Sequence, residues 1–233
     1  HRSRPVSGRP RQLASSSLSK EKIRVELLSV LVAARDTTSN LLGNLFFILA
    51  RRPDIWIKIR DEVSRLDTNV PTSTYEQLRH LTYAKYCINE CQSCFSIKVL
   101  ADVPLALRLH PPVPSNGRMS YRDTILPHGG SPNGEQPIHA PKVSMVNYTV
   151  YAMHRRKDLY GQDAEEFCPE RWESLRPSWF FLPFNGGPRI CLGQQYAVTG
   201  SLLVIMRFAQ EFISIRSMDA KPWTEEIAWF WQC

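Results

Sequence analysis

The sequence predicts a mainly α-helical protein with small β elements, and three observations lead to this fold class. The run from Lys22 to Arg52 contains no proline, and two shorter stretches after it place apolar residues at helical spacing. Short β-prone pieces lie between residues 117 and 150, among glycine- and proline-rich turns. The sheet content is therefore expected to be minor.

The composition is ordinary for a globular chain and excludes some function classes. Apolar residues make up 43% of the 233 residues and charged residues 22%, so most of the chain is expected to fold. The formal net charge is +7, but the basic residues are spread out rather than interleaved with aromatic residues, so nucleic-acid binding is not expected. Six cysteines follow no regular framework, which favours a reducing compartment.

The start of the sequence indicates that something precedes it, because it begins with His1 rather than Met. No apolar run reaches the about 18 residues of a membrane-spanning helix, and none has the layout of a signal peptide. A membrane anchor is therefore expected only in an absent N-terminal part. Residues 1–18, basic and rich in serine and proline, are interpreted as a linker or loop, and residues 19–233 as one domain.

The first helix is expected to follow Ser19, a suitable N-cap, and to continue over residues 22–52 as one long helix or two in succession. Its stretch LLSVLVAA, residues 27–34, is apolar on every side, which is typical of a helix buried in the middle of a protein. The polar stretch RDTT that follows, residues 35–38, is unexpected in that setting and requires an explanation.

Amphipathic helices are expected at residues 53–66 and 73–90, around a turn over 67–74, and the proline-rich LHPPVPSN ends this helical half. Residues 117–150 are expected to form hairpins or a small sheet. Helical spacing returns from Gln194 to Ile213.

The sharpest chemical signal is FNGGPRICLG, Phe184 to Gly193, which presents Cys191 just before the last predicted helix. Gly186 and Gly187 permit a tight turn whose backbone N–H groups can point at the sulfur, and a helix N-terminus favours an anion. Cys191 is therefore predicted to be held as a thiolate. The alternative is a buried structural cysteine after a loop.

This segment matches the cytochrome P450 haem signature F-x-x-G-x-R-x-C-x-G at every fixed position, and the chain resembles the C-terminal, haem-binding portion of that family. The resemblance implies a cytochrome P450 fold, haem b, and Cys191 as the ligand of its iron. It also implies that Phe184 packs beside the sulfur, Arg189 pairs with a haem propionate and Gly193 lets the helix backbone approach the porphyrin. A thiolate ligand donates electron density to iron and favours O–O cleavage.

A second segment, AARDTT at residues 33–38, resembles the oxygen-activation motif A-G-x-D-T-T of the long central P450 helix. Ala33 and Thr37 share a helix face at i and i+4, so a small residue leaves space beside a hydroxyl that can pass protons. The resemblance makes Asp36 and Thr37 the catalytic candidates for proton delivery. Ala34 replaces the usual glycine, which is expected to narrow the groove; the alternative is a solvated polar patch.

A third segment, FCPERW, resembles the P-E-R-F motif, whose arginine, here Arg171, closes a Glu-Arg-Arg network with an E-x-x-R helix. Arg118 falls where many P450s place a second propionate-binding arginine, although a surface charge explains it equally well. The E-x-x-R pair is broken here, because Glu90 and Arg108 lie eighteen positions apart.

Deletion of residues 92–106 brings Glu90 and Arg108 into E-x-x-R register. We therefore hypothesise that this segment is a translated intron or another insertion, which a comparison of cDNA with genomic sequence tests. The Cys91-x-x-Cys94 pair that it creates has no second Cys/His pair at suitable spacing after it, so we interpret it as a coincidence rather than a zinc or redox motif.

The resemblance covers residues 18–220 and is greatest to fungal alkane-assimilating P450s, which hydroxylate the terminal carbon of n-alkanes and fatty acids. It implies a monooxygenase of lipophilic substrates that receives electrons from NADPH through NADPH-cytochrome P450 reductase, on the cytosolic face of the endoplasmic reticulum membrane. Two alternatives remain. One is a catalytically inactive P450 fragment or gene-model remnant; the other is a haem-thiolate isomerase or dehydratase, against which Asp36 and Thr37 argue.

Overall fold

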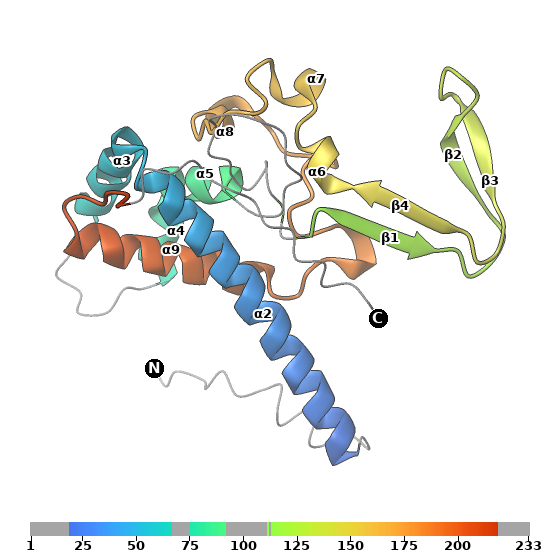
Figure 1. Cartoon of the computed structure of the whole chain (residues 1–233), viewed down its shortest axis with the longest axis horizontal. Helices are drawn as coiled ribbons and strands as arrows, with labels where there is room; N and C mark the ends of the chain where they lie inside the picture. The colour runs from blue at the N-terminus through green and yellow to red at the C-terminus, as the bar shows by residue number, and fades with distance from the viewer. Residues whose placement is uncertain (1–18, 67–74, 92–110, 112, 219–233) are drawn as a thin grey trace.

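The computed structural model of the chain describes residues 19–66, 75–91, 111 and 113–218. Helices dominate these residues and the strands are short, which confirms the predicted mainly α fold with small β elements (Figure 1). The predicted linker 1–18, the turn 67–74, the proposed insertion 92–106 and Arg108 lie outside the described residues. No helix within the described part is long and apolar enough to cross a bilayer.

The elements follow one another along the chain in a helical half, a section with strands and a final helix. In order they are α2 Lys20–Leu49, α3 Pro53–Ser64, α4 Tyr75–His80, α5 Thr82–Glu90, β1 Ser115–Met119, β2 Thr124–Gly130, β3 Gln136–Ala140, β4 Met145–Thr149, α6 Val150–Met153, α7 Lys157–Tyr160, α8 Arg171–Ser174, the 3₁₀ turn η1 Gly187–Arg189 and α9 Gln194–Glu211.

Helix α2 confirms the predicted long helix and is unbroken over 30 residues. The Ser19 hydroxyl caps it by accepting a hydrogen bond from the backbone N–H of Lys22 at 3.3 Å, as an N-cap serine does. Its C-terminal part enters the core through four side chains: Leu41, Leu45, Ile48 and Leu49.

The burial expected for residues 27–34 is wrong for this chain. The large apolar side chains of this stretch are exposed, and Leu31 is 61% exposed. Figure 1 shows the N-terminal half of α2 extending away from the other helices, which explains the exposure. A helix that is apolar on every side needs neighbours on every side, and the described part of the chain supplies them only to the second half of α2.

The core lies where the end of α2 meets α3, α5 and α9. Trp56 of α3 is buried there, and its indole N–H donates to the carbonyl of Ile213 just beyond α9 at 3.3 Å. Phe46 of α2 packs on Phe208 of α9, with ring centroids 4.7 Å apart. Helices from both ends of the sequence therefore share one core.

The single helix expected over residues 73–90 is wrong, because α4 and α5 are separate helices that meet at Leu81. Leu81 is buried and leaves the helical region, with φ −74° and ψ 76°. The Glu62 carboxylate of α3 accepts the backbone N–H groups of Tyr83 and Ala84 at 2.7 and 2.9 Å. A carboxylate from another helix thus replaces the partners that a continuous helix would offer these donors.

The strands form two separate antiparallel ribbons, β1 with β4 and β2 with β3, which confirms the predicted hairpins or small sheet. In the β1–β4 ribbon Asn116 lies opposite Tyr148, and Arg118 lies opposite Val146. Helix α9 begins at Gln194 as predicted and ends at Glu211, two residues before the predicted end.

Candidate functional site

The loop before α9 presents Cys191 at the molecular surface. The backbone N–H of Cys191 donates to the carbonyl of Phe184 at 2.9 Å, so a hydrogen bond closes the loop at its two ends. Gly187 has φ +69°, in the left-handed region that favours glycine, and it begins the 3₁₀ turn η1. Cys191 is exposed and forms no disulfide.

Gly186 has a different role in this loop from the one predicted. Its φ of −150° is extended, which suits any residue, but a Cβ at this position would lie 2.7 Å from the ring of Trp179. The second positive φ of the loop, +65°, belongs to Asn185. The prediction that both glycines make the turn is therefore right for Gly187 and wrong for Gly186, which is required by packing instead.

The N-terminus of α9 supplies the electrostatic part of the site. Gly193 is the N-cap and no side-chain hydrogen bond caps the helix, so backbone N–H groups of the first turn form its positive end. Cys191 lies two residues before this cap. A Cβ at Gly193 would lie 3.8 Å from the Cys191 Sγ atom, so glycine leaves that side of the sulfur uncovered. The Cys191 sulfur therefore lies uncovered, close to the positive end of α9.

The exposure of this loop fits a large apolar ligand that binds through sulfur. Free cysteine is among the most buried residue types, yet Cys191 stands exposed between Ile190 and Leu192, which are 46% and 81% exposed. The alternative of a buried structural cysteine is therefore wrong. Arg189 is also exposed, which leaves its guanidinium available to an anion. These donors suit a haem with its iron and propionates.

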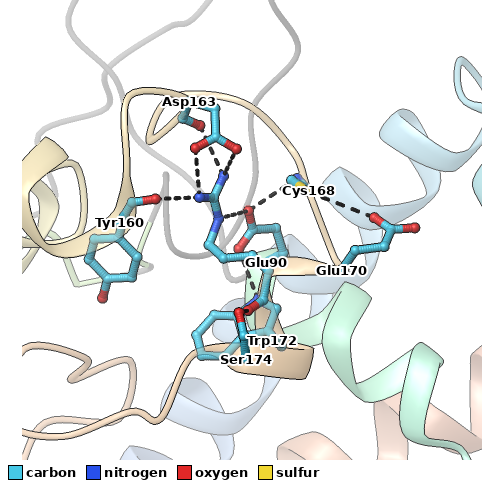
Figure 2. A network of polar contacts seen from close by, with 8 residues as sticks. Glu90, Tyr160, Asp163, Cys168, Glu170, Trp172 and Ser174 are labelled. Atoms are coloured by element: carbon cyan, nitrogen blue, oxygen red, sulfur yellow. Dashed lines mark hydrogen bonds and ion pairs between the residues drawn. The ribbon is translucent and has the colours of Figure 1, made fainter.

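Glu90, at the end of α5, is fully buried and accepts hydrogen bonds, three of which come from residues 168–172. The donors are the backbone N–H of Cys168 at 3.1 Å, Nε of Arg171 at 3.3 Å and the indole N–H of Trp172 at 2.9 Å (Figure 2). The structure thus brings Glu90 and Arg171 together. The third expected member, Arg108, lies outside the described residues.

Arg171 has further partners on the other side of its guanidinium. Asp163 accepts from Nη1 and Nη2 at 3.0 and 2.9 Å, and the Tyr160 carbonyl also accepts from Nη1 (Figure 2). Burial alone would lower the pKa of Arg171, but the Asp163 hydrogen bond and the Glu90 charge outweigh it and the pKa lies above its ordinary value. Sequence reasoning missed Asp163, which no motif marks, and Trp172, which directly follows Arg171.

Asp36 and Thr37 lie near the middle of α2, before its first buried side chain, Leu41. The Thr37 hydroxyl donates to the Ala33 carbonyl at 2.7 Å, which confirms that these two residues share a face. Asp36 is exposed, with an oxygen 3.8 Å from Nε of Arg35. Among the described residues no hydrogen bond or ion pair joins Asp36 or Thr37 to the cysteine loop, so their catalytic role stays a prediction.

Arg118 is exposed on β1. Its Nη1 donates to the Gly117 carbonyl at 2.8 Å, and its guanidinium lies 5.8 Å from the centroid of the Tyr148 ring. The guanidinium has five N–H donors, and one of them is hydrogen-bonded within the described residues, so the others can bind an anion. This placement is compatible with a propionate contact, which stays a prediction.

The cysteine loop, the helix behind it and the buried glutamate–arginine network together define a haem-thiolate type of protein. The cytochrome P450 family model matches residues 7–228, and the chain belongs to this family. Its fold is accordingly part of the cytochrome P450 fold.

Three fungal relatives illustrate the similarity. The chain is 82% identical to cytochrome P450 monooxygenase FPY7 of Fusarium mangiferae, over 94% of this chain and 39% of the relative. It is 54% identical to cytochrome P450 monooxygenase fsdH of Fusarium heterosporum, over 94% and 36%. It is 43% identical to cytochrome P450 52A12 of Debaryomyces hansenii, over 89% and 39%. The chain thus spans less than half the length of these relatives.

Proposed function

We propose that this chain forms the haem-binding part of a monooxygenase that inserts one oxygen atom of O2 into a C–H bond of a lipophilic substrate. The observation that carries the proposal is the exposed Cys191 thiol in a closed loop at the N-terminal end of α9. The names of two relatives, both called monooxygenases, support the same reaction class.

The residues of this chain have distinct roles in that proposal. Cys191 would hold the iron of haem b through its thiolate, which the end of α9 stabilises. Arg189 and Arg118 would pair with the propionates, and Phe184 would flank the sulfur. Bound haem supplies the activation of dioxygen and the oxidation of the C–H bond.

Thr37 and Asp36 would deliver protons to the reaction. The Thr37 hydroxyl donates its own proton to the Ala33 carbonyl, so the lone pairs of its oxygen are free to accept a hydrogen bond from water or substrate. The exposed Asp36 can exchange protons with solvent and pass them along the helix surface. An acid in contact with solvent beside a hydroxyl is a suitable start for a proton relay.

The substrate class is proposed from the resemblance to fungal alkane-assimilating P450s: n-alkanes and fatty acids, hydroxylated at the terminal carbon. Electrons would come from NADPH through NADPH-cytochrome P450 reductase. The reaction would take place on the cytosolic face of the endoplasmic reticulum membrane. The fungal origin of the relatives supports the resemblance to fungal P450s on which this proposal rests.

The ligand assignment is tested by the CO-difference spectrum of the dithionite-reduced, haem-supplemented protein. We expect a thiolate-type Soret band that is lost in Cys191→Ala and kept in Cys168→Ala, a matched control at a cysteine that is also not disulfide-bonded. The absence of the band in the unaltered protein would instead favour the inactive-fragment alternative.

The reaction is tested by incubation with NADPH, the reductase and either an n-alkane or a fatty acid. We expect the terminal alcohol, with an oxygen atom derived from O2, as the product. Product formation without O2 consumption would contradict the proposal and indicate an isomerase or a dehydratase.

A further inference from the structure

Asn185, in the cysteine loop, is hydrogen-bonded to residues outside the loop. Its Oδ1 accepts from the Tyr148 hydroxyl at 2.7 Å, and its Nδ2 donates to Oδ1 of Asn116 at 3.4 Å. Tyr148 and Asn116 face each other across the β1–β4 ribbon. One amide side chain therefore joins the loop to both strands at a single cross-strand pair.

The backbone of Asn185 explains why asparagine suits this position. Its φ of +65° lies in the left-handed region, which asparagine tolerates because its short side chain can bond locally. Here Oδ1 accepts the N–H of the next residue, Gly186, at 2.9 Å. Glycine would also adopt this φ but would lack every side-chain hydrogen bond. Asparagine combines the turn with its hydrogen bonds to Tyr148 and Asn116, which we call the anchor.

The anchor relates two groups that the proposed function assigns to the same cofactor. Asn116 and Arg118 are two residues apart on β1, so their side chains lie on the same face of the ribbon, and the Arg118 guanidinium is beside the Tyr148 ring. On the loop side, Asn185 directly follows Phe184, whose carbonyl accepts the Cys191 N–H. A short path of contacts therefore connects Cys191 to Arg118.

We propose that Asn185 is a positioning residue that fixes the cysteine loop on the β1–β4 ribbon. It thereby holds the Cys191 thiol in the position relative to Arg118 that lets both residues contact one haem. The inference rests on the proposed function, because it takes Cys191 as the iron ligand. Asn185 itself would not contact iron, but it would set the geometry of the cysteine loop.

The test uses Asn185→Gly, which keeps the positive φ and removes the anchor, and Tyr148→Phe, which removes only the shortest bond. Tyr121→Phe is the matched control, since Tyr121 is 77% exposed and its hydroxyl has no hydrogen bond among the described residues. The first measurement is amide hydrogen exchange of the loop without haem. We expect the Cys191 N–H to exchange about tenfold faster in Asn185→Gly, less in Tyr148→Phe, and unchanged in Tyr121→Phe.

The second measurement is the fraction of the CO complex that shows a thiolate-type Soret band. A residue that only stabilises the fold would lower the total haem content, whereas loss of positioning lowers the thiolate-type fraction of the haem that is bound. We expect the latter in Asn185→Gly, and the double variant with Tyr148→Phe to be no worse, because both changes act on one network.

Unchanged exchange and an unchanged thiolate-type fraction in Asn185→Gly would overturn the inference. If the unaltered protein itself shows no thiolate-type band, the proposed function fails and, with it, the role toward haem. The exchange measurement then still decides whether Asn185 anchors the loop, so the two failures are distinguishable.

Discussion

The Glu90 carboxylate is fully buried, and its environment shows how this chain tolerates a charge in its interior. A buried charge without partners is strongly destabilising, but residues 168–172 give Glu90 three donors, and the Arg171 guanidinium is itself held by Asp163. The donors come from one segment, residues 168–172, that is far from Glu90 in sequence. The network therefore ties α5 to the segment before the cysteine loop.

Trp172→Phe tests the least expected member of this network. The substitution keeps an aromatic ring and removes the N–H that bonds to Glu90, so we expect a loss of about 1.5–3 kcal/mol in the free energy of unfolding. Urea denaturation followed by circular dichroism measures it. The control is Trp179→Phe at a tryptophan that is 71% exposed, where we expect a change within about 0.5 kcal/mol. Equal losses at both positions would contradict the role assigned to Trp172.

Thr37 is expected to matter for chemistry rather than for stability, because it is partly exposed and, as far as the structure describes the chain, its hydroxyl bonds only within its own helix. Thr37→Ala should lower the rate of product formation on the order of 10²-fold, the size typical of lost proton transfer, while haem binding is kept. Thr37→Ser retains the hydroxyl and should restore most of the rate. A rate in Thr37→Ala equal to that of the unaltered protein would show that the hydroxyl does not pass protons.

At the scale of elements, the break between α4 and α5 depends on a contact from α3. The Glu62 carboxylate accepts two N–H groups in the first turn of α5, where it also meets the positive end of the helix. Glu62→Ala should therefore lower the free energy of unfolding by about 0.5–2 kcal/mol, as for loss of a helix cap. Thermal denaturation measures the change, and Asp61→Ala, at the neighbouring residue, should leave the stability nearly unaltered.

Glu170 joins three elements and predicts a dependence of stability on pH. Its Oε1 accepts from Lys58 of α3 at 2.5 Å and from the Tyr83 hydroxyl of α5 at 2.8 Å. Burial alone would raise the pKa of Glu170, but the hydrogen bonds from Lys58, the backbone and Tyr83, together with the Lys58 charge, outweigh burial, and the pKa lies below its ordinary value of 4.5. A carboxyl group whose pKa is lowered on folding stabilises the fold at pH values above its pKa in the unfolded state. This contribution is lost as the pH falls through the pKa of the folded state.

Glu170→Gln should therefore be less stable than the unaltered protein at neutral pH and should lose less stability as the pH falls below 4.5. Urea denaturation at a series of pH values measures both effects. The neutral-pH difference should be modest, because the pair with Lys58 is partly exposed. Glu173→Gln, an exposed residue of the same short helix, should follow the pH dependence of the unaltered protein.

At the scale of the whole molecule, the N-terminal half of α2 is the outstanding apolar surface. Val25, Leu28 and Leu31 are 61%, 49% and 61% exposed there, and α2 extends away from the shared core (Figure 1). Exposed apolar patches of this kind favour association. We expect this chain to associate at micromolar concentration when it is expressed by itself.

Sedimentation velocity over a range of concentrations tests this expectation. The double variant Leu28→Lys and Leu31→Lys should shift the protein toward the monomer, because two charges replace the centre of the patch. Met218→Lys changes an apolar side chain that is 96% exposed but lies outside the patch, and it should leave the association unchanged. Monomeric behaviour of the unaltered chain would contradict the expectation.

The sequence by itself determined the features that depend on neighbouring residues. The capped start of α2, the start of α9 and the closed cysteine loop were predictable, because an N-cap serine, helical spacing and a positive-φ glycine act within a few residues. The family motifs also marked Glu90 and Arg171, although they lie far apart in the chain.

Only the tertiary structure decided the features that depend on residues distant in sequence. The helix break at Leu81 requires its burial and the Glu62 carboxylate, and the role of Gly186 requires the Trp179 ring. The anchor at Asn185 requires two facing strands. The exposure of residues 27–34 follows in the same way, because an apolar sequence specifies that a helix is suited to burial, whereas the surrounding elements determine whether it is buried.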